Sequence, residues 1–195
     1  MSRQNPPLSD GELVRLSLEN TDFYEQIVER YEAPLLRYLL RISNISREEA
    51  EDLLQEVFIK AYQNLRDFDQ DLKFSSWIYR IAHNEAISAW RKRSSRGEQV
   101  DLEKAEAAQL LRSTLDIPAQ ADDQFLAQSV QTILADLPTK YREVLILRFL
   151  ENKDYSEISD IIRRPMGSVA TLISRAKKQF ERSARSADLA KFLEK

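Results

Sequence analysis

Apolar side chains recur at the spacing of one helical face in the segment that runs from Ser168 to Arg182. The five apolar positions of this stripe are Val169, Leu172, Ile173, Ala176 and Phe180. Because an α-helix turns by about 100° per residue, the opposite face is fixed, and it displays Thr171, Ser174, Arg175, Lys178 and Arg182. Cations and short polar groups suit phosphates and base edges, so the segment predicts a packed helix that binds nucleic acid.

A shorter amphipathic helix is expected just upstream, from Tyr155 to Ile162. Between the two helices lie residues 163–167, Arg-Arg-Pro-Met-Gly, and Ser168 is placed to cap the second helix. This order predicts a helix-turn-helix motif, whose second helix enters the major groove of DNA. A cationic face that is merely solvated is the simpler interpretation of the charge alone; the turn and the preceding helix favour DNA binding.

The residue choice favours helix along the whole chain. Its 195 residues include only 3 Gly and 6 Pro, and Leu, Ala, Glu, Arg, Lys and Gln make up much of the rest. Capping boxes mark three helix starts, at Ser9 with Glu12, Ser46 with Glu49, and Asp154 with Glu157. The predicted fold class is all-α, with two small helical domains joined by a flexible linker.

The expected helices divide the chain into three parts. An amino-terminal domain (1–96) would hold helices near 9–18, 21–43, 47–66 and 75–94, and a carboxy-terminal domain (122–195) would hold helices near 122–136, 139–151, 155–163 and 168–185. Residues 97–121 have weak periodicity and many acidic and small residues, which is typical of a linker. A solvated amphipathic helix from Asp101 to Leu111 is the alternative for this part.

Charge is strongly segregated, although the net charge is only −3. Residues 10–32 carry seven acidic and two basic side chains, which disfavours phosphate binding there. Residues 73–96 carry six basic and one acidic side chain, and residues 163–185 carry seven basic and one acidic side chain. Two basic patches therefore mark two possible contacts with nucleic acid.

The first basic patch also contains aromatic residues. Lys73, Arg80, Asn84 and Arg91 fall along one side of the expected helix, and aromatic side chains lie among them: Phe68, Phe74, Trp77, Tyr79 and Trp90. Cations with stacking surfaces are typical of sites for single-stranded DNA. The alternative is that most of these aromatic rings belong to the core, and for Phe68 and Trp90 this is the preferred interpretation.

The helix that begins at Arg47 has one apolar residue in the middle of its polar face. Its core stripe is Ala50, Leu53, Leu54, Val57, Ala61 and Leu65, whereas Ile59 lies on the opposite face near Asp52, Gln55 and Glu56. Isolated exposed apolar residues are common. Ile59 is therefore either one of these or the centre of a protein interface, and both interpretations stay open on the residues alone.

Several functional classes are disfavoured. The chain has no cysteine, one histidine, no Gly-rich phosphate loop and no metal-ligand spacing, so we expect no enzyme activity, cofactor or metal site. The amino terminus lacks the apolar core of a signal peptide, and apolar runs are too short to cross a bilayer. A cytoplasmic protein without membrane insertion is expected.

The order of these segments resembles the extracytoplasmic-function (ECF) group of the sigma-70 family of bacterial RNA polymerase. Residues 52–62 are similar to the family segment that docks on the clamp helices of the largest polymerase subunit, which implies binding by Asp52, Gln55, Glu56 and Ile59. Residues 74–84 resemble the segment that binds the minus-10 element as a melted strand, with a base flipped toward the loop at 67–73 and Asn84. The implied minus-10 residues are Lys73, Phe74, Ser75, Ser76, Trp77, Arg80, Asn84 and Arg91.

Residues 137–148 and the following helix-turn-helix resemble the family domain that reads the duplex minus-35 element. The implied contacts are Arg163, Arg164, Ser168, Thr171, Ser174, Arg175 and Lys178. Ala170 and Leu172 stand where the family usually has basic residues, so minus-35 recognition is expected to be unusual. The resemblance implies core RNA polymerase, promoter DNA and an anti-sigma factor as partners. A stand-alone helix-turn-helix regulator and a sequestering mimic are the alternatives, and neither accounts for both basic patches together with the Ile59 face.

Overall fold

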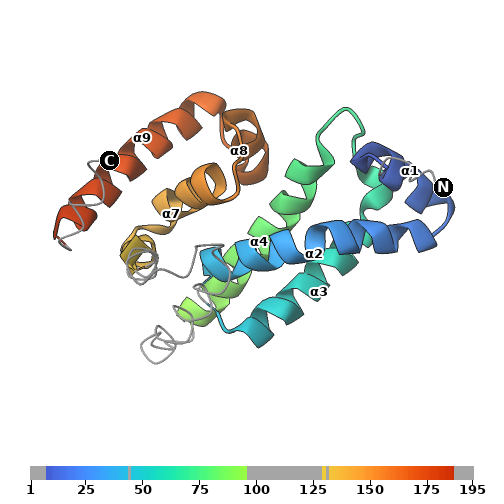
Figure 1. The fold of residues 1–195 in the computed structure, drawn as a ribbon, viewed down its shortest axis with the longest axis horizontal. Coiled ribbons are helices and arrows are strands. Elements are labelled where there is room, and N and C mark those ends of the chain that lie inside the picture. The colour runs from blue at the N-terminus through green and yellow to red at the C-terminus, as the bar shows by residue number, and fades with distance from the viewer. Residues whose placement is uncertain (1–7, 44, 96–128, 131, 187–195) are drawn as a thin grey trace, which may run out of the picture.

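The computed structural model describes residues 8–43, 45–95, 129–130 and 132–186 (Figure 1). These residues form helices and their connections, and no strand occurs among them. The all-α prediction is therefore confirmed for the described part of the chain. Within the same residues, no helix combines the length and the apolar character needed to cross a bilayer. The predicted linker, residues 97–121, lies outside the described residues.

The amino-terminal unit consists of four α-helices and one short 3₁₀ helix. They are α1 (Asp10–Glu19), α2 (Asp22–Ser43), α3 (Arg47–Gln63), η1 (Leu65–Asp67) and α4 (Phe74–Ser95). Ser9 and Ser46 cap α1 and α3, and in each case a glutamate three residues later closes the capping box. The predicted helix at 47–66 thus ends at Gln63, and its last turn is the separate 3₁₀ helix η1.

The carboxy-terminal unit contains a helical segment at 129–130 and 132–136, followed by α7 (Thr139–Leu145), a π-helical turn η2 (Ile146–Leu150), α8 (Tyr155–Ile162) and α9 (Met166–Ser186). Asp154 caps α8 as predicted. The prediction that Ser168 caps the last helix is wrong, because α9 already begins at Met166. The backbone N–H groups of Ser168 and Val169 donate to the carbonyl oxygen of Pro165, so Ser168 belongs to the first turn.

The apolar stripes predicted from the sequence form the core. All six predicted core residues of α3 and its 3₁₀ extension are buried, and in α9 Val169, Ile173 and Ala176 are buried while Leu172 and Phe180 are partly buried against them. Trp90 departs from its preferred assignment to the core, since 39% of its surface is exposed. Ala86 is the last buried residue described in α4, and the side chains described beyond it, from 87 to 92, are partly buried or exposed.

The two units pack against each other. Helix α8 contacts α4, and η2 contacts α2 (Figure 1). One apolar cluster therefore runs through both units, and only Ile133 and Ala184 form a separate small cluster among the described residues. Helix α9 lies on the outer side of the carboxy-terminal unit and packs on α7 and α8. This arrangement brings Arg163, at the start of the second basic segment, within electrostatic reach of Arg80 in the first.

Candidate nucleic-acid interface

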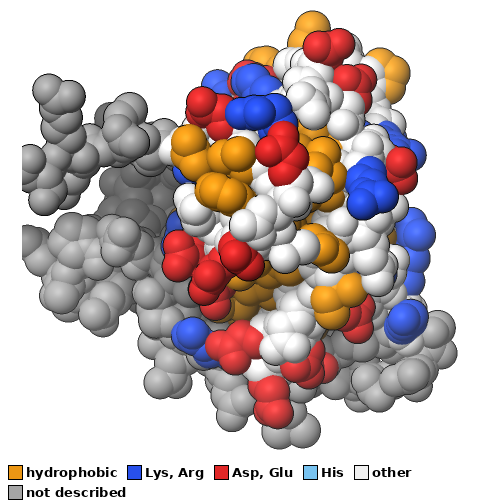
Figure 2. Space-filling model, turned by 90° about the vertical axis from the view of Figure 1, so that its right-hand side faces the viewer, with side chains coloured by type: hydrophobic (Ala, Val, Ile, Leu, Met, Phe, Trp, Pro, Cys, Tyr) orange, Lys and Arg blue, Asp and Glu red, His pale blue; other side chains and the backbone are white. Residues whose placement is uncertain are grey.

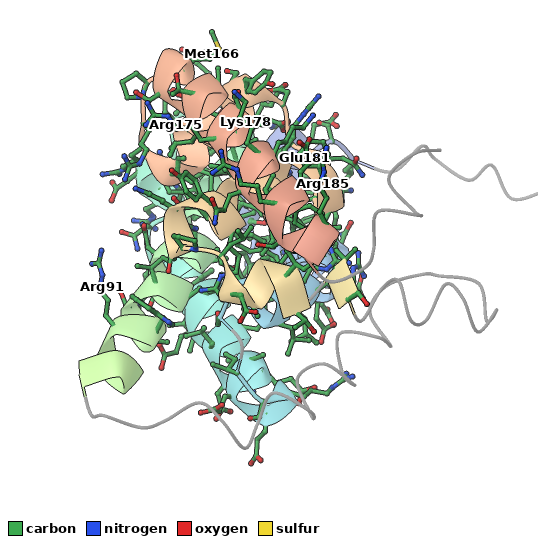
Figure 3. All side chains as sticks on the ribbon, turned by 90° about the vertical axis from the view of Figure 1, so that its left-hand side faces the viewer. Arg91, Met166, Arg175, Lys178, Glu181 and Arg185 are labelled. Carbon is green, nitrogen blue, oxygen red and sulfur yellow. The ribbon has the colours of Figure 1, made fainter. Side chains whose placement is uncertain are left out.

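The outer face of α9 carries the polar and cationic side chains that the helical spacing predicted. Ser168, Thr171, Ser174, Arg175 and Lys178 are exposed, and Figure 3 shows Arg175 and Lys178 on the surface of this helix. Only Thr171 has its hydroxyl group engaged locally, because it donates to the carbonyl oxygen of Gly167 at 3.0 Å. The face can therefore approach an anionic groove without rearrangement of α9.

The turn before α9 is held in a left-handed conformation. Arg163 ends α8 with φ 51° and ψ 51°, a region that favours glycine. The hydroxyl group of Ser159 donates to the carbonyl oxygen of Arg164 at 2.6 Å, and the backbone N–H of Arg164 donates back to the Ser159 carbonyl oxygen. This short loop directs α9 away from α8 and leaves Arg163 and Arg164 exposed at the entry to the cationic face.

The second candidate surface lies on α4 and the residue before it. Lys73, Asn84 and Arg91 are exposed, and Ser75 and Arg80 are partly exposed. Figure 3 shows Arg91 projecting from the far end of α4. The predicted alignment of Lys73, Arg80, Asn84 and Arg91 along the helix therefore leaves each of them at least partly accessible in the structure.

The remaining minus-10 candidates are buried. Phe74, Ser76 and Trp77 each expose less than a tenth of their surface. The ring of Trp77 lies 5.2 Å from that of Phe68 and 5.5 Å from that of Phe74, measured between centroids, and Tyr31 packs edge-on against Phe74. In this arrangement these aromatic side chains anchor the start of α4 in the core. They do not form an open stacking platform.

Acidic side chains at the start of α8 lie beside Lys73, the residue that precedes α4. Nζ of Lys73 is 3.4 Å from Oδ2 of Asp154 and 3.6 Å from Oε1 of Glu157. The nearby carboxylate of Glu157, followed by the hydrogen bond to Asp154, raises the pKa of Lys73. Burial, followed by the positive charge of Arg163, lowers the pKa of Arg80. Charged side chains of the carboxy-terminal unit therefore act electrostatically on both Lys73 and Arg80.

A third surface lies on α3. Asp52, Gln55, Glu56 and Ile59 are all exposed, with Ile59 at 55%. Tyr62 extends this face one turn further at 45% exposure, a contribution that the sequence pattern did not reveal. Tyr24 supports it from α2, because its ring packs edge-on against Tyr62 at 5.0 Å and its hydroxyl group donates to the carbonyl oxygen of Phe58. The α3 face thus has an apolar centre formed by Ile59 and Tyr62, which Tyr24 supports and carboxylate side chains border.

The end of the amino-terminal unit that carries α1 is rich in acidic side chains. Figure 2 shows this side of the molecule, where acidic and hydrophobic side chains are prominent. The sequence explains this charge, because residues 10–32 contain seven acidic and two basic side chains. The distribution of charge therefore leaves the basic surfaces of α4 and α9 as the candidate surfaces for nucleic acid.

Together, these features define an all-helical DNA-binding protein with a helix-turn-helix unit and a second basic helix that starts in an aromatic core. Comparison with known families is consistent with both parts, since the Sigma-70 region 2 family matches residues 27–96 and the Sigma-70 region 4 family matches residues 127–180.

Full-length relatives extend the match across most of the chain. The ECF RNA polymerase sigma factor SigW of Bacillus subtilis is 32% identical over 84% of this chain and 90% of its own. The ECF RNA polymerase sigma-E factor of Haemophilus influenzae is 30% identical over 89% of this chain and 94% of its own. The solved structure of CnrH, in complex with the cytosolic domain of CnrY, has the same fold, with a TM-score of 0.67 at 22% identity over 91% of this chain and 97% of CnrH.

The chain belongs to the sigma-70 family and is an RNA polymerase sigma factor of the ECF type. A stand-alone helix-turn-helix regulator is not favoured, because that alternative leaves the region 2 match of the amino-terminal unit without an explanation.

Proposed function

We propose that the α3 face binds core RNA polymerase at the clamp helices of its largest subunit. The observation that carries this proposal is the exposure of Ile59 between Asp52, Gln55 and Glu56, in the segment that matches Sigma-70 region 2. An exposed apolar centre with a polar rim has the composition of a protein interface. Tyr62 extends the apolar centre and adds an aromatic side chain, a type enriched among residues that dominate binding energy.

The minus-10 element is assigned to α4 and the preceding loop. Lys73, Arg80 and Arg91 would neutralise phosphates of the open strand, and Ser75 and Asn84 offer hydrogen bonds to a flipped base. Phe74, Ser76 and Trp77 are given a supporting role, because their burial lets them set the position of the surface residues. Capture of the open strand would stabilise the melted promoter.

The minus-35 element is assigned to α9 and the turn before it. Thr171, Ser174, Arg175 and Lys178 share the exposed face that would enter the major groove, and Ser168 begins that face. Arg163 and Arg164 are suited to the flanking phosphates. Ala170 and Leu172 supply no charge, so base readout would depend on fewer cations than the resemblance leads one to expect.

The protein would act by binding alone, with chemistry left to the polymerase. Since its partner enzyme and promoter DNA are in the cytoplasm, we assign it to that compartment without insertion into the membrane. Control by an anti-sigma factor is part of the proposal. It is supported by the solved structures of CnrH with the cytosolic domain of CnrY and of RpoE from Bartonella quintana with the anti-sigma factor NepR.

The test is to mix the purified protein with bacterial core RNA polymerase and to measure complex formation by native gel shift and by fluorescence titration. A variant with alanine at Asp52, Gln55, Glu56 and Ile59 should bind at least about tenfold more weakly, because truncation at an interface centre costs more than about 1.4 kcal/mol. Circular dichroism should show that the variant keeps its helices.

A matched control places the same chemical changes elsewhere on the amino-terminal unit. Leu18, Glu25, Gln26 and Glu29 are exposed residues of α1 and α2 and comprise one aliphatic, one amide and two acidic side chains. Their alanine variant should bind core polymerase like the unchanged protein. Equal weakening by both variants, or no complex with the folded unchanged protein, would refute the assignment of the α3 face.

A further inference from the structure

Met166 is the most exposed large apolar side chain among the residues that the structure describes, with 57% of its surface accessible. It is the first residue of α9, and Figure 3 shows it projecting from that end of the helix. Val169 and Ile173, the nearest buried members of the apolar stripe, belong to the core, whereas Met166 lies outside it. Isolated exposed apolar residues are common, so the position of Met166 decides whether it has a role.

That position is the part of a helix-turn-helix unit that reads DNA. In this motif the amino-terminal residues of the second helix contact base edges in the major groove. Ala170 follows Met166 by one helical turn, so the two lie on the same flank of α9, and Ala170 is also exposed. Gly167 has no side chain beside them, and a Cβ atom added there would have no nearby atom to clash with. The Met166–Ala170 flank is therefore open to a ligand.

The charged residues around this flank favour DNA as that ligand. Arg163 and Arg164 precede α9, Arg175 lies further along it, and all three side chains are exposed. Such cations bind phosphates, which carry no sequence information directly. A protein partner would need a larger apolar centre than one methionine and one alanine, because stable protein interfaces bury about 800 Å² on each side. A flank this small fits a single apolar group in a groove lined by phosphates.

Duplex DNA offers one such group in the major groove. Of the four bases, only thymine presents a methyl group there, and apolar side chains recognise it by direct contact. The unbranched thioether of methionine adapts its shape to irregular surfaces, which suits such a contact. Neither Met166 nor Ala170 can form the charged hydrogen bonds that guanine favours. Thymine is therefore the base that this flank matches.

We propose that Met166, with Ala170 beside it, recognises the C5-methyl group of a thymine in the minus-35 element. Met166 is thus a specificity-determining residue, and an apolar contact takes the place of the cation that is missing at Ala170. The inference rests on the proposed binding of the minus-35 element by α9, and it adds the chemical group that this part of the helix reads.

The methyl group can be removed from the DNA without any other change. Duplex sites are selected from a random library in parallel with the core polymerase complex and with the free full-length protein. Each selected thymine is then replaced by deoxyuridine, which lacks only the C5-methyl group. Replacement of the thymine that Met166 contacts should weaken binding about fourfold, or about 0.8 kcal/mol, as for one buried aliphatic carbon. Fluorescence anisotropy of labelled duplexes gives each affinity.

Variants of the protein show whether Met166 makes the contact. Met166→Ala should bind the thymine and deoxyuridine duplexes with nearly equal affinity, because the apolar partner of the methyl group is gone. Met166→Leu keeps an apolar side chain of similar size and should retain most of the fourfold difference. As a matched control, Phe149→Ala truncates another apolar side chain of the carboxy-terminal unit that is 48% exposed, and it should leave the fourfold difference unchanged.

A purely structural role of Met166 would affect other measurements. Met166→Ala does not alter charge, so the dependence of duplex affinity on salt concentration should match that of the unchanged protein. Circular dichroism should show the same helical content. If Met166→Ala changes the salt dependence or the helical content, Met166 positions α9 and the inference is overturned.

The remaining outcomes separate this inference from the proposed function. The inference also fails if neither selection enriches a thymine at a fixed position, or if Met166→Ala keeps the fourfold difference. A protein that binds core polymerase but does not distinguish thymine from deoxyuridine would count against the role of Met166 alone. A free protein that shows the Met166-dependent difference but forms no complex with core polymerase would count against the proposed α3 interface alone.

Discussion

The hydroxyl oxygen of Tyr38 lies 2.9 Å from Nδ1 of His83, and both side chains are buried between α2, α4 and the carboxy-terminal unit. The other ring nitrogen faces the carboxylate of Glu143 at 3.6 Å. Burial lowers the pKa of His83 to about 4. Burial also raises the pKa of Glu143, against the opposing effects of Arg164 and Arg142. His83, with a neutral ring, thus links Tyr38 in the core of the amino-terminal unit to Glu143 of the carboxy-terminal unit.

Stability should therefore fall on acidification. The unfolded chain protonates His83 near pH 6.5, whereas the folded chain resists protonation until about pH 4. Between these values the unfolded state binds more protons, so the free energy of unfolding decreases as the pH is lowered. Glu143 has the opposite effect on the free energy of unfolding. Burial disfavours its ionised carboxylate and so raises its pKa, and protonation at low pH removes this cost. The comparison with His83→Gln isolates the histidine.

Urea unfolding at pH 7 and pH 5 measures the effect. The unchanged protein should lose about 2 kcal/mol more than His83→Gln over this interval. The variant retains a side chain that can bond to Tyr38, so its stability at pH 7 serves as the baseline. The same pH dependence in both proteins would show that His83 is not held neutral in the folded state.

The main effect of truncating Trp77 should be a loss of folding stability, and not the loss of a direct contact with DNA. Trp77 packs against Phe68 and Phe74 and is 8% exposed, so Trp77→Ala should reduce the free energy of unfolding by about 3 to 5 kcal/mol. Trp77→Phe keeps an aromatic ring and should cost less. Chemical denaturation gives both values. A Trp77→Ala protein of unchanged stability that no longer binds single-stranded DNA would instead establish a direct contact with a base.

The left-handed turn between α8 and α9 offers a gain in stability. Because Arg163 has φ 51°, its side chain meets the strain that glycine avoids, and Arg163→Gly should stabilise the protein by about 0.5 to 1 kcal/mol. Asn152 has φ 52°, but asparagine tolerates this conformation better, so Asn152→Gly should change stability less. Thermal unfolding compares the two. Destabilisation by Arg163→Gly would mean that the charge of Arg163 outweighs the strain.

Local patterns in the sequence predicted most of the fold because helix starts and core stripes depend on residues within a few turns. The capping glutamates at 12, 49 and 157 each lie three residues after their caps. The predicted stripes of α3 and α9 pack inward for the same reason. The exposed residues Arg175 and Ile59 follow from these stripes by geometry, so the helical period alone places both on the surface.

Features that depend on distant parts of the chain could not be predicted in this way. Arg41 and Glu151 form an ion pair between the two units, although they are 110 positions apart and neither stands out from the other charged residues of the sequence. A core position is the preferred interpretation of Trp90 from the sequence, but the structure leaves 39% of its surface exposed. Ser168 has the residue type of a cap, yet Pro165 allows α9 to start two residues before it.

Recognition of the minus-35 element should depend on Arg175. This residue lies in the middle of the exposed face of α9, where Ala170 and Leu172 contribute no charge, so Arg175 is one of few cations that can reach a base edge. If Arg175 reads a base, Arg175→Ala should weaken duplex binding by about 1 to 3 kcal/mol and relax the preference at one base pair.

The duplex sites for this measurement are first selected from a random duplex library with the core polymerase complex. Arg185→Ala, at the far end of the same helix, removes the same charge and should reduce affinity only slightly at every sequence. If both variants lose the same duplex affinity and the base preference is unchanged, Arg175 contacts a phosphate and does not read a base.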